Sequence, residues 1–249
     1  MPTRILPATF RTAAISLLGL ALLGCATVPP SERNPRDPWQ RVNRGVFKFN
    51  EAFDRAIFKP VARTYLRAPQ VIRTGIGNFF NNLSYPGVIL NAALQGQPKA
   101  FARDTGRFVV NSTIGIGGLL DPATRLGLTL ENRDFGQTFG KWGIPSGPFV
   151  ELPILGPSDV RDAIGLVPAE YADPRHYIQN PYWDYGLAGL DGVKTRADYL
   201  PLTDMAEQNF DPYAFERNAY LQQRDFAVKG AAPPNKNSAQ EELKELQQQ

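Results

Sequence analysis

The order of hydrophobic and polar residues predicts a mostly helical protein. After Asp37-Pro38, apolar residues recur at steps of three and four, the spacing of one face of an α-helix. The stripe comprises Trp39, Val42, Val46, Phe49, Phe53 and Ile57. Asp37 can cap this helix and Pro38 suits its first turn, whereas Pro60 interrupts the pattern. We therefore expect an amphipathic helix of about five turns.

Further helical stretches follow at intervals along the chain. The expected segments are 61–67, 71–83, 86–94, 97–111, 158–163, 185–200 and a last helix from Asp211-Pro212. The segment that Pro86 opens is apolar almost all round, so it must be buried in protein or in lipid. Residues 170–184, rich in Pro, Tyr and Trp, are expected to form a loop.

The stretch FGQTFGKWGIPSGPFVELPILGP, residues 135–157, has a different pattern. Its glycines and prolines predict two short extended arms, 137–142 and 149–153, around a turn at 144–147. Glycine relieves the backbone restrictions that hold a loop in one conformation. The predicted gate or hinge of this hairpin comprises Gly140, Gly143 and Gly147. The alternative is a static turn packed into a core.

The N-terminus has the pattern of a bacterial lipoprotein signal. Two arginines precede an apolar run, 13–23, which ends in Leu-Leu-Gly-Cys. This lipobox pattern implies cleavage before Cys25 and attachment of acyl chains to it, and Ala26 favours the outer membrane. The alternative is an ordinary signal peptide with a leftover cysteine. The expected organisation is a signal, 1–24, an acylated tether, 25–36, one folded domain, 37–230, and a disordered tail, 231–249.

Charge and composition exclude several classes of protein. The chain of 249 residues has a formal net charge of +3, which falls to +1 when Arg4 and Arg11 leave with the signal. A charge so close to zero gives no support for binding nucleic acid. The single cysteine, once acylated, leaves no thiol for a disulfide. After Cys25 no apolar run is long enough to span a bilayer, so the amphipathic helices are expected to lie in the plane of one leaflet.

Four segments resemble the MlaA (VacJ) family of outer-membrane lipoproteins. They are DPWQRVNRGVFKFNEAFD, NFFNNLSYPGVILNAALQG, ENRDFGQTFGKWGIPSGPFVELPILGPSDVRDAIG and DPYAFERNAYLQQRDF. The resemblance implies a mostly α fold, a ring-like bundle embedded in the inner leaflet of the outer membrane around a central amphipathic channel. It also implies a function in which misplaced phospholipid is removed from the outer leaflet and retrograde transport maintains lipid asymmetry. The implied partners are trimeric porins, a soluble periplasmic phospholipid carrier and an inner-membrane ABC transporter complex.

A local excess of basic residues suggests where headgroups bind. Between Ser31 and Arg73, ten Lys or Arg stand against four Asp or Glu, an excess of +6. Such an excess can hold phosphates, although a solvated basic face explains it as well. The candidate headgroup contacts are Arg41, Arg44 and Lys48.

Catalysis has little support in the sequence. The only histidine, His176, stands in a Pro-containing loop, and Ser146 in GIPSG is displaced from the GxSxG pattern of hydrolases. Asp159 and Asp162 form a carboxylate pair, but such a pair is more typical of a helix cap. We expect no catalytic residue, no metal site and no cofactor. A lipid hydrolase and a structural lipoprotein that tethers outer-membrane proteins remain the alternatives.

Overall fold

The computed structural model describes residues 34–206 and 211–229, and helices dominate this part of the chain. The signal, Cys25 and the tail beyond 230 lie outside the described residues. In order, the elements are α2 (Gln40–Phe53), the π-helical segment η2 (Asp54–Phe58), α3 (Lys59–Tyr65), α4 (Gln70–Leu94), α5 (Pro98–Thr113), α6 (Pro122–Arg125), α7 (Phe135–Lys141), β1 (Phe149–Leu152), β2 (Gly156–Asp159), α8 (Val160–Ala172), the 3₁₀ helix η3 (Pro174–Tyr177), α9 (Pro181–Ala206) and α10 (Pro212–Lys229).

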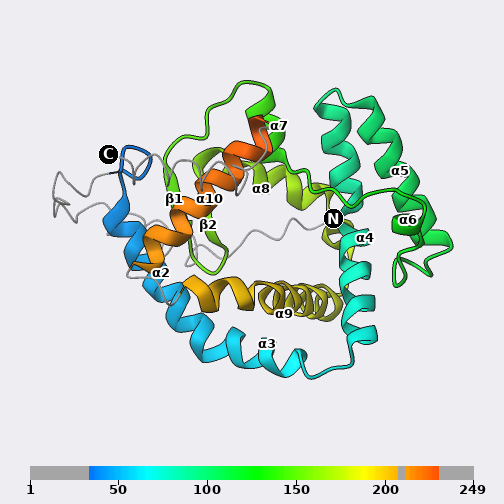
Figure 1. Ribbon diagram of the computed structural model, residues 1–249, viewed down its shortest axis with the longest axis horizontal. Coiled ribbons are helices and arrows are strands. Elements are labelled where there is room, and N and C mark those ends of the chain that lie inside the picture. The colour runs from blue at the N-terminus through cyan, green and yellow to red at the C-terminus, as the bar shows by residue number, and fades with distance from the viewer. Residues whose placement is uncertain (1–33, 207–210, 230–249) are drawn as a thin grey trace, which may run out of the picture.

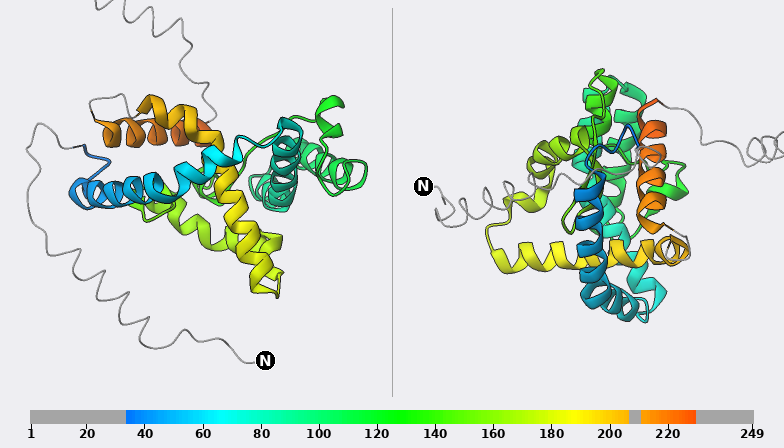
Figure 2. Two further views of the ribbon diagram at one scale, coloured as in Figure 1. Left: turned by 90° about the horizontal axis from the view of Figure 1, so that it is seen from below. Right: turned by 90° about the vertical axis from the view of Figure 1, so that its left-hand side faces the viewer.

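These elements form a ring (Figure 1). The rod formed by α2, η2 and α3 lies along one side, α4 stands opposite, and α7, α8 and α10 complete the circuit. Figure 2 shows α9 crossing this rod, where Ala197 and Leu200 pack against Ala62 of α3. The helices α5 and α6 lie outside the ring against α4 (Figure 1).

Aspartates set several helix starts. Asp121, Asp134 and Asp159 each accept a hydrogen bond from the backbone N–H three residues later, at 3.1, 2.7 and 2.8 Å. This is the bond of an N-cap. Asp211 makes the same bond to the Ala214 N–H at 3.1 Å, which confirms the predicted helix after Asp211-Pro212. The prediction that Asp37 caps the first helix is wrong, because Trp39 precedes α2 and the Asp37 carboxylate is buried elsewhere.

The prolines of the long helices are accommodated inside them. Pro86 lies within α4, so the prediction of two separate helices over 71–94 is wrong. Pro60 stands in the first turn of α3, which follows α2 through η2 without a loop. The region expected as a loop, 170–184, contains the end of α8, all of η3 and the start of α9. These predictions gave proline too much weight as a helix breaker. A helix that loses one backbone hydrogen bond at a proline can still be supported by tertiary packing.

The predicted hairpin is also partly wrong. Residues 137–142 are not an extended arm, because α7 covers nearly all of them. The second arm is confirmed as β1, but its antiparallel partner is β2, with Phe149 opposite Asp159 and Leu152 opposite Gly156. The hairpin therefore comprises residues 149–159, and Gly140, Gly143 and Gly147 precede it.

Burial in this molecule differs from that typical of a water-soluble globule. Among the described residues, 12 hydrophobic residues are buried, but 16 polar or charged ones are buried too, and 32 large hydrophobic side chains are exposed. In a soluble protein, charged side chains are almost never fully buried and large apolar patches are rare. Hydrogen-bonded polar groups therefore join many of the elements beside two small apolar clusters, and many large apolar side chains lie on the surface.

Candidate functional site

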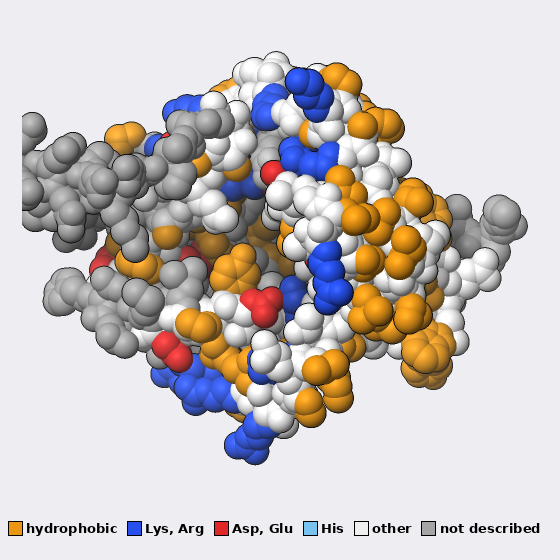
Figure 3. Space-filling model, turned by 45° about the vertical axis from the view of Figure 1, so that its right-hand side comes forward, with side chains coloured by type: hydrophobic (Ala, Val, Ile, Leu, Met, Phe, Trp, Pro, Cys, Tyr) orange, Lys and Arg blue, Asp and Glu red, His pale blue; other side chains and the backbone are white. Residues whose placement is uncertain are grey.

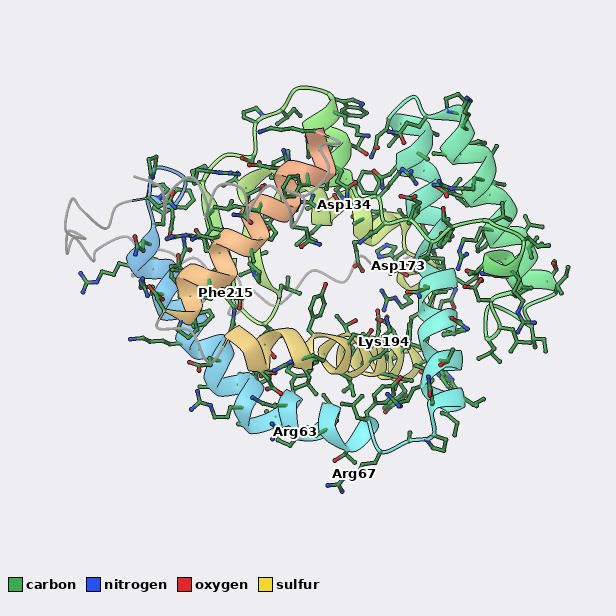
Figure 4. All side chains as sticks on the ribbon, viewed as in Figure 1. Arg63, Arg67, Asp134, Asp173, Lys194 and Phe215 are labelled. Carbon is green, nitrogen blue, oxygen red and sulfur yellow. The ribbon has the colours of Figure 1, made fainter. Side chains whose placement is uncertain are left out.

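The centre of the ring is the first candidate site. Figure 3 shows a hollow in this face of the molecule, with hydrophobic side chains on its floor and both acidic and basic side chains at its edge. The labelled side chains Asp134, Asp173, Lys194 and Phe215 come from four different parts of the chain and lie around the opening (Figure 4). The surface of the hollow is therefore amphipathic.

The charged groups at this rim are held in ion pairs. Arg224 binds Asp134 through two hydrogen bonds of 2.6 and 2.8 Å, and it also pairs with Asp162. Burial works to raise the pKa of Asp134, but hydrogen bonds and charge from Arg224 lower it below its usual value. Lys194 pairs with Asp198 at 3.0 Å. Because these acidic and basic side chains neutralise one another, the rim is polar but has little net charge.

Other ion pairs join elements that are distant in sequence. Arg196 of α9 binds Asp54 of η2 at 2.5 and 2.8 Å. Arg175 bridges Asp173 at 2.6 Å and Asp191 at 2.8 Å, which connects the end of α8 to α9. Such pairs fix helix positions around the opening without filling it with side chains.

A buried carboxyl group on β1, Glu151, interacts electrostatically with a half-buried one on α10, Glu216. Burial and the charge of Glu216 raise the pKa of Glu151 to about 8. Burial likewise raises the pKa of Glu216 to about 7, against the opposing effect of Arg196. Asn50 donates a hydrogen bond of 2.9 Å to Glu151. These groups are therefore held partly in their protonated forms near neutral pH.

The predicted headgroup contacts lie on α2, with different surroundings. Arg44 binds Asp211 through bonds of 3.0 and 2.5 Å and stacks over the Tyr213 ring, 4.6 Å from its centroid. Its hydrogen bonds lower the pKa of Asp211. Arg41 and Lys48 are exposed, and Lys48 lines a small groove with Glu51 and Arg55. Arg44 has a clear structural role, and the headgroup assignment of all three stays a prediction.

The three predicted hinge glycines also differ. Gly140 lies in α7, where an added Cβ would approach the Val228 methyl groups to 2.8 Å. Gly143 and Gly147 follow the helix with φ of +91° and +71°, the left-handed region that glycine tolerates best. Gly140 thus permits a close helix contact, and the other two shape a loop. Their motion stays a prediction.

The candidate catalytic residues are engaged in other contacts. The His176 ring packs against Tyr171 and Tyr177, with centroids 4.8 and 5.2 Å apart, and its Nδ1 lies 3.3 Å from Glu170. The backbone carbonyl of Ser146 accepts a bond from the Arg161 N–H. The expected helix cap is confirmed, since Asp159 caps α8. Within the described ranges, no cluster of His, Cys, Asp or Glu could hold a metal ion, and no helix is long and apolar enough to cross a membrane.

Residues 35–227 match the model of the MlaA lipoprotein family, from before α2 to near the end of α10. The chain belongs to the MlaA lipoprotein family. It is 33% identical to the intermembrane phospholipid transport system lipoprotein MlaA of Escherichia coli K12 over 95% of this chain and 98% of that protein. The MlaA of Haemophilus influenzae is 34% identical over 88% of this chain and 90% of its own length.

A solved structure extends the likeness to the fold. It is described as the structural basis for maintenance of bacterial outer membrane lipid asymmetry, and it matches with a TM-score of 0.69 and 34% identity over 79% of this chain and all of that one. The mostly helical MlaA fold with a small two-stranded sheet is thereby confirmed.

Sequence reasoning missed most of the side chains that shape this MlaA ring. Asp134, Asp173, Arg196 and Arg224 were not singled out, although they join distant elements. One signal was available: an aspartate such as Asp134 just before a helical stretch is a typical N-cap, and the Gln137 backbone N–H donates to its carboxylate at 2.7 Å.

Proposed function

We propose that this protein is an outer-membrane lipoprotein that takes phospholipid from the outer leaflet through its central opening and delivers it to a soluble periplasmic carrier. The observation that carries the proposal is the amphipathic hollow inside a ring whose exterior exposes large apolar side chains. A phospholipid combines a charged head with apolar tails, so its path needs both kinds of surface. The names of the relatives, intermembrane phospholipid transport lipoproteins, support the same function.

The exterior supports a location in one leaflet. Hydrophobic side chains gather on the side formed by α4, α5 and α6 (Figure 3). Around the turns that flank α6, Ile114, Ile116 and Leu126 are 67%, 66% and 65% exposed. Water disfavours such a surface, whereas acyl chains stabilise it by about 25 cal/mol per Å². A ring of helices that lies in one leaflet gives an outer-leaflet lipid a route inward without a spanning helix.

The finer parts of the proposal concern partners and direction. Transport is retrograde and is completed by the carrier and an inner-membrane ABC transporter complex, and trimeric porins lie beside the ring in the membrane. No bond is made or broken. Among the described residues, His176 contacts aromatic rings and Glu170, and no contact with a serine is seen. This arrangement supports a transport function over hydrolysis.

Photochemical crosslinking tests the path. The photoreactive analogue p-benzoylphenylalanine is placed at Phe215, on α10 beside the opening, in protein reconstituted into phospholipid bilayers. We expect lipid adducts at this position by mass spectrometry. Val71, which is 84% exposed at the start of α4, is the positive control, and protein without the photoreactive residue is the negative control. Adducts at Val71 without adducts at Phe215 would show that lipid stays outside the ring.

A further inference from the structure

A basic groove runs along the outer side of η2 and α3, separate from the central opening. Its cations recur every four residues and comprise Arg55, Lys59, Arg63 and Arg67. Glu51 and Pro212, the first residue of α10, help to close a cavity of about 760 Å³. Figure 4 shows Arg63 and Arg67 on the side of the ring away from the opening. This volume is within the range of small-molecule sites.

The groove has more positive charge than its own carboxylates neutralise. Arg55 pairs with Glu51 at 2.6 Å, and Lys59 pairs with Asp204 at 3.1 Å. Arg63 and Arg67 are exposed and form no ion pair with any part of the chain that the structure describes. The excess positive charge of the groove is therefore that of Arg63 and Arg67.

Arg63 and Arg67 are four residues apart at the end of α3, so their like charges lie close together. A bound anion offsets this repulsion. Arginine presents its donors in a planar fork that matches phosphate oxygens, and three of the four cations are arginines.

The surroundings favour a ligand that comes from a membrane. Ile57 and Val61, on the same rod, are 49% and 46% exposed, and Val71 follows at 84%. A helix with exposed apolar residues on one side and a basic row on another is suited to the boundary between acyl chains and headgroups. Basic residues at such a boundary are attracted to the phosphates of lipid headgroups.

We propose that this groove binds the phosphate ester of a phospholipid headgroup, with Arg63 and Arg67 as its principal ligands. The proposal rests on the lipid-transport function above and adds a second lipid contact, outside the opening. Phosphate could also come from a soluble ester, so the experiment separates the two sources.

Binding is measured by calorimetry on full-length mature protein in a nonionic detergent. The probes are dihexanoyl phosphatidic acid, glycerol 3-phosphate and inorganic phosphate. The test variant is the double substitution Arg63→Gln and Arg67→Gln. The control removes the same charge elsewhere, by Lys99→Gln and Arg125→Gln, at exposed positions on α5 and α6 outside the groove. Thermal melting of each variant verifies that it is folded.

We expect the test variant to bind the short-chain lipid at least tenfold more weakly than wild type, and the control to differ by less than twofold. If lipid binding weakens equally in both variants, or in neither, the groove is not the phosphate site. If glycerol 3-phosphate binds wild type as tightly as the lipid does, and the test variant loses this binding, the ligand is a soluble phosphate ester and the proposal of a lipid ligand is wrong. Because no transfer is measured, failure here leaves passage through the opening untouched.

Discussion

Asp37 shows at the residue scale how one buried charge joins three parts of the chain. Its carboxylate accepts hydrogen bonds from Tyr213 at 2.5 Å, Asn43 at 2.8 Å and Arg217 at 3.0 Å. Both Asp37 and Arg217 are almost completely buried. Such a pair contributes little when intact, because both charges have lost their water, but it is costly to break.

Replacing Asp37 with Ala therefore leaves a buried guanidinium without its carboxylate. We expect Asp37→Ala to lower the free energy of unfolding by about 3–5 kcal/mol in chemical denaturation. Glu170→Ala is the control, since the Glu170 side chain is 69% exposed and its loss should change stability by less than about 0.5 kcal/mol. Similar stability of the two variants would contradict the role given to Asp37.

Glu151 provides a pH-dependent prediction. Its pKa is about 8 in the folded protein against 4.5 in a free side chain, so between these values the folded state binds the additional proton. The contribution of Glu151 to stability is therefore greatest below pH 4.5 and falls as the pH rises towards 8. Glu151→Gln removes this dependence while keeping an acceptor for Asn50.

We expect the Glu151→Gln variant to melt at a higher temperature than wild type at pH 8.5, and the difference to shrink at pH 5. A difference that is the same at both pH values, or larger at pH 5, would show that Glu151 ionises normally.

Neighbouring residues in the sequence made some of the helix starts predictable. The Asp211-Pro212 pair predicts a helix start and the structure confirms it, whereas Asp37 of the pair Asp37-Pro38 does not cap α2. The pair of Arg44 with Asp211, 167 positions apart, has no local signal. Only the tertiary fold decides that such groups meet.

At the scale of elements, α7 shows why a glycine-rich stretch was misread. Gly136 and Gly140 lower helix propensity, so the sequence favours an extended arm. In the structure, the absence of their side chains lets α7 approach α8 and α10, with Asp162 and Val228 close to the two glycines. Packing therefore overrides propensity. The amphipathic stripe over α2 was predicted apart from its boundaries, and the helical character of α4 was predicted although its division at Pro86 was wrong.

A pair of glycine substitutions tests this explanation. A Cβ at Gly140 would lie 2.8 Å from Val228 and 2.9 Å from Arg161, whereas one at Gly45 in α2 meets nothing within 4 Å. We expect Gly140→Ala to destabilise the protein by about 1–3 kcal/mol. Gly45→Ala should stabilise it by about 0.5–1 kcal/mol through helix propensity. Equal effects in thermal melting would show that α7 does not pack closely on α10.

The whole molecule has a shape that sequence patterns alone do not predict. Periodicity indicates which side of a helix is apolar, but not whether that side faces a core or a lipid, because both environments are apolar. The ring and its opening were expected from the family resemblance, and the mostly helical family fold is confirmed. The exposed apolar residues now give that shape a physical reason, since lipid can cover what water cannot.

The outward apolar surface predicts membrane affinity even without the acyl anchor expected at Cys25. A mature form with Cys25→Ser, which cannot be acylated, should still partition into the detergent phase in phase-separation experiments. Recovery of this variant as a monodisperse monomer in detergent-free buffer would contradict the embedded ring.

The most direct test of the account is transfer of lipid itself. Fluorescent phospholipid is placed in one leaflet of vesicles that contain the protein, and its appearance on a soluble lipid-binding acceptor on the opposite side is followed. We predict transfer of intact phospholipid that requires the protein. Equal transfer from protein-free vesicles, or release of a hydrolysed product, would contradict a path through the ring.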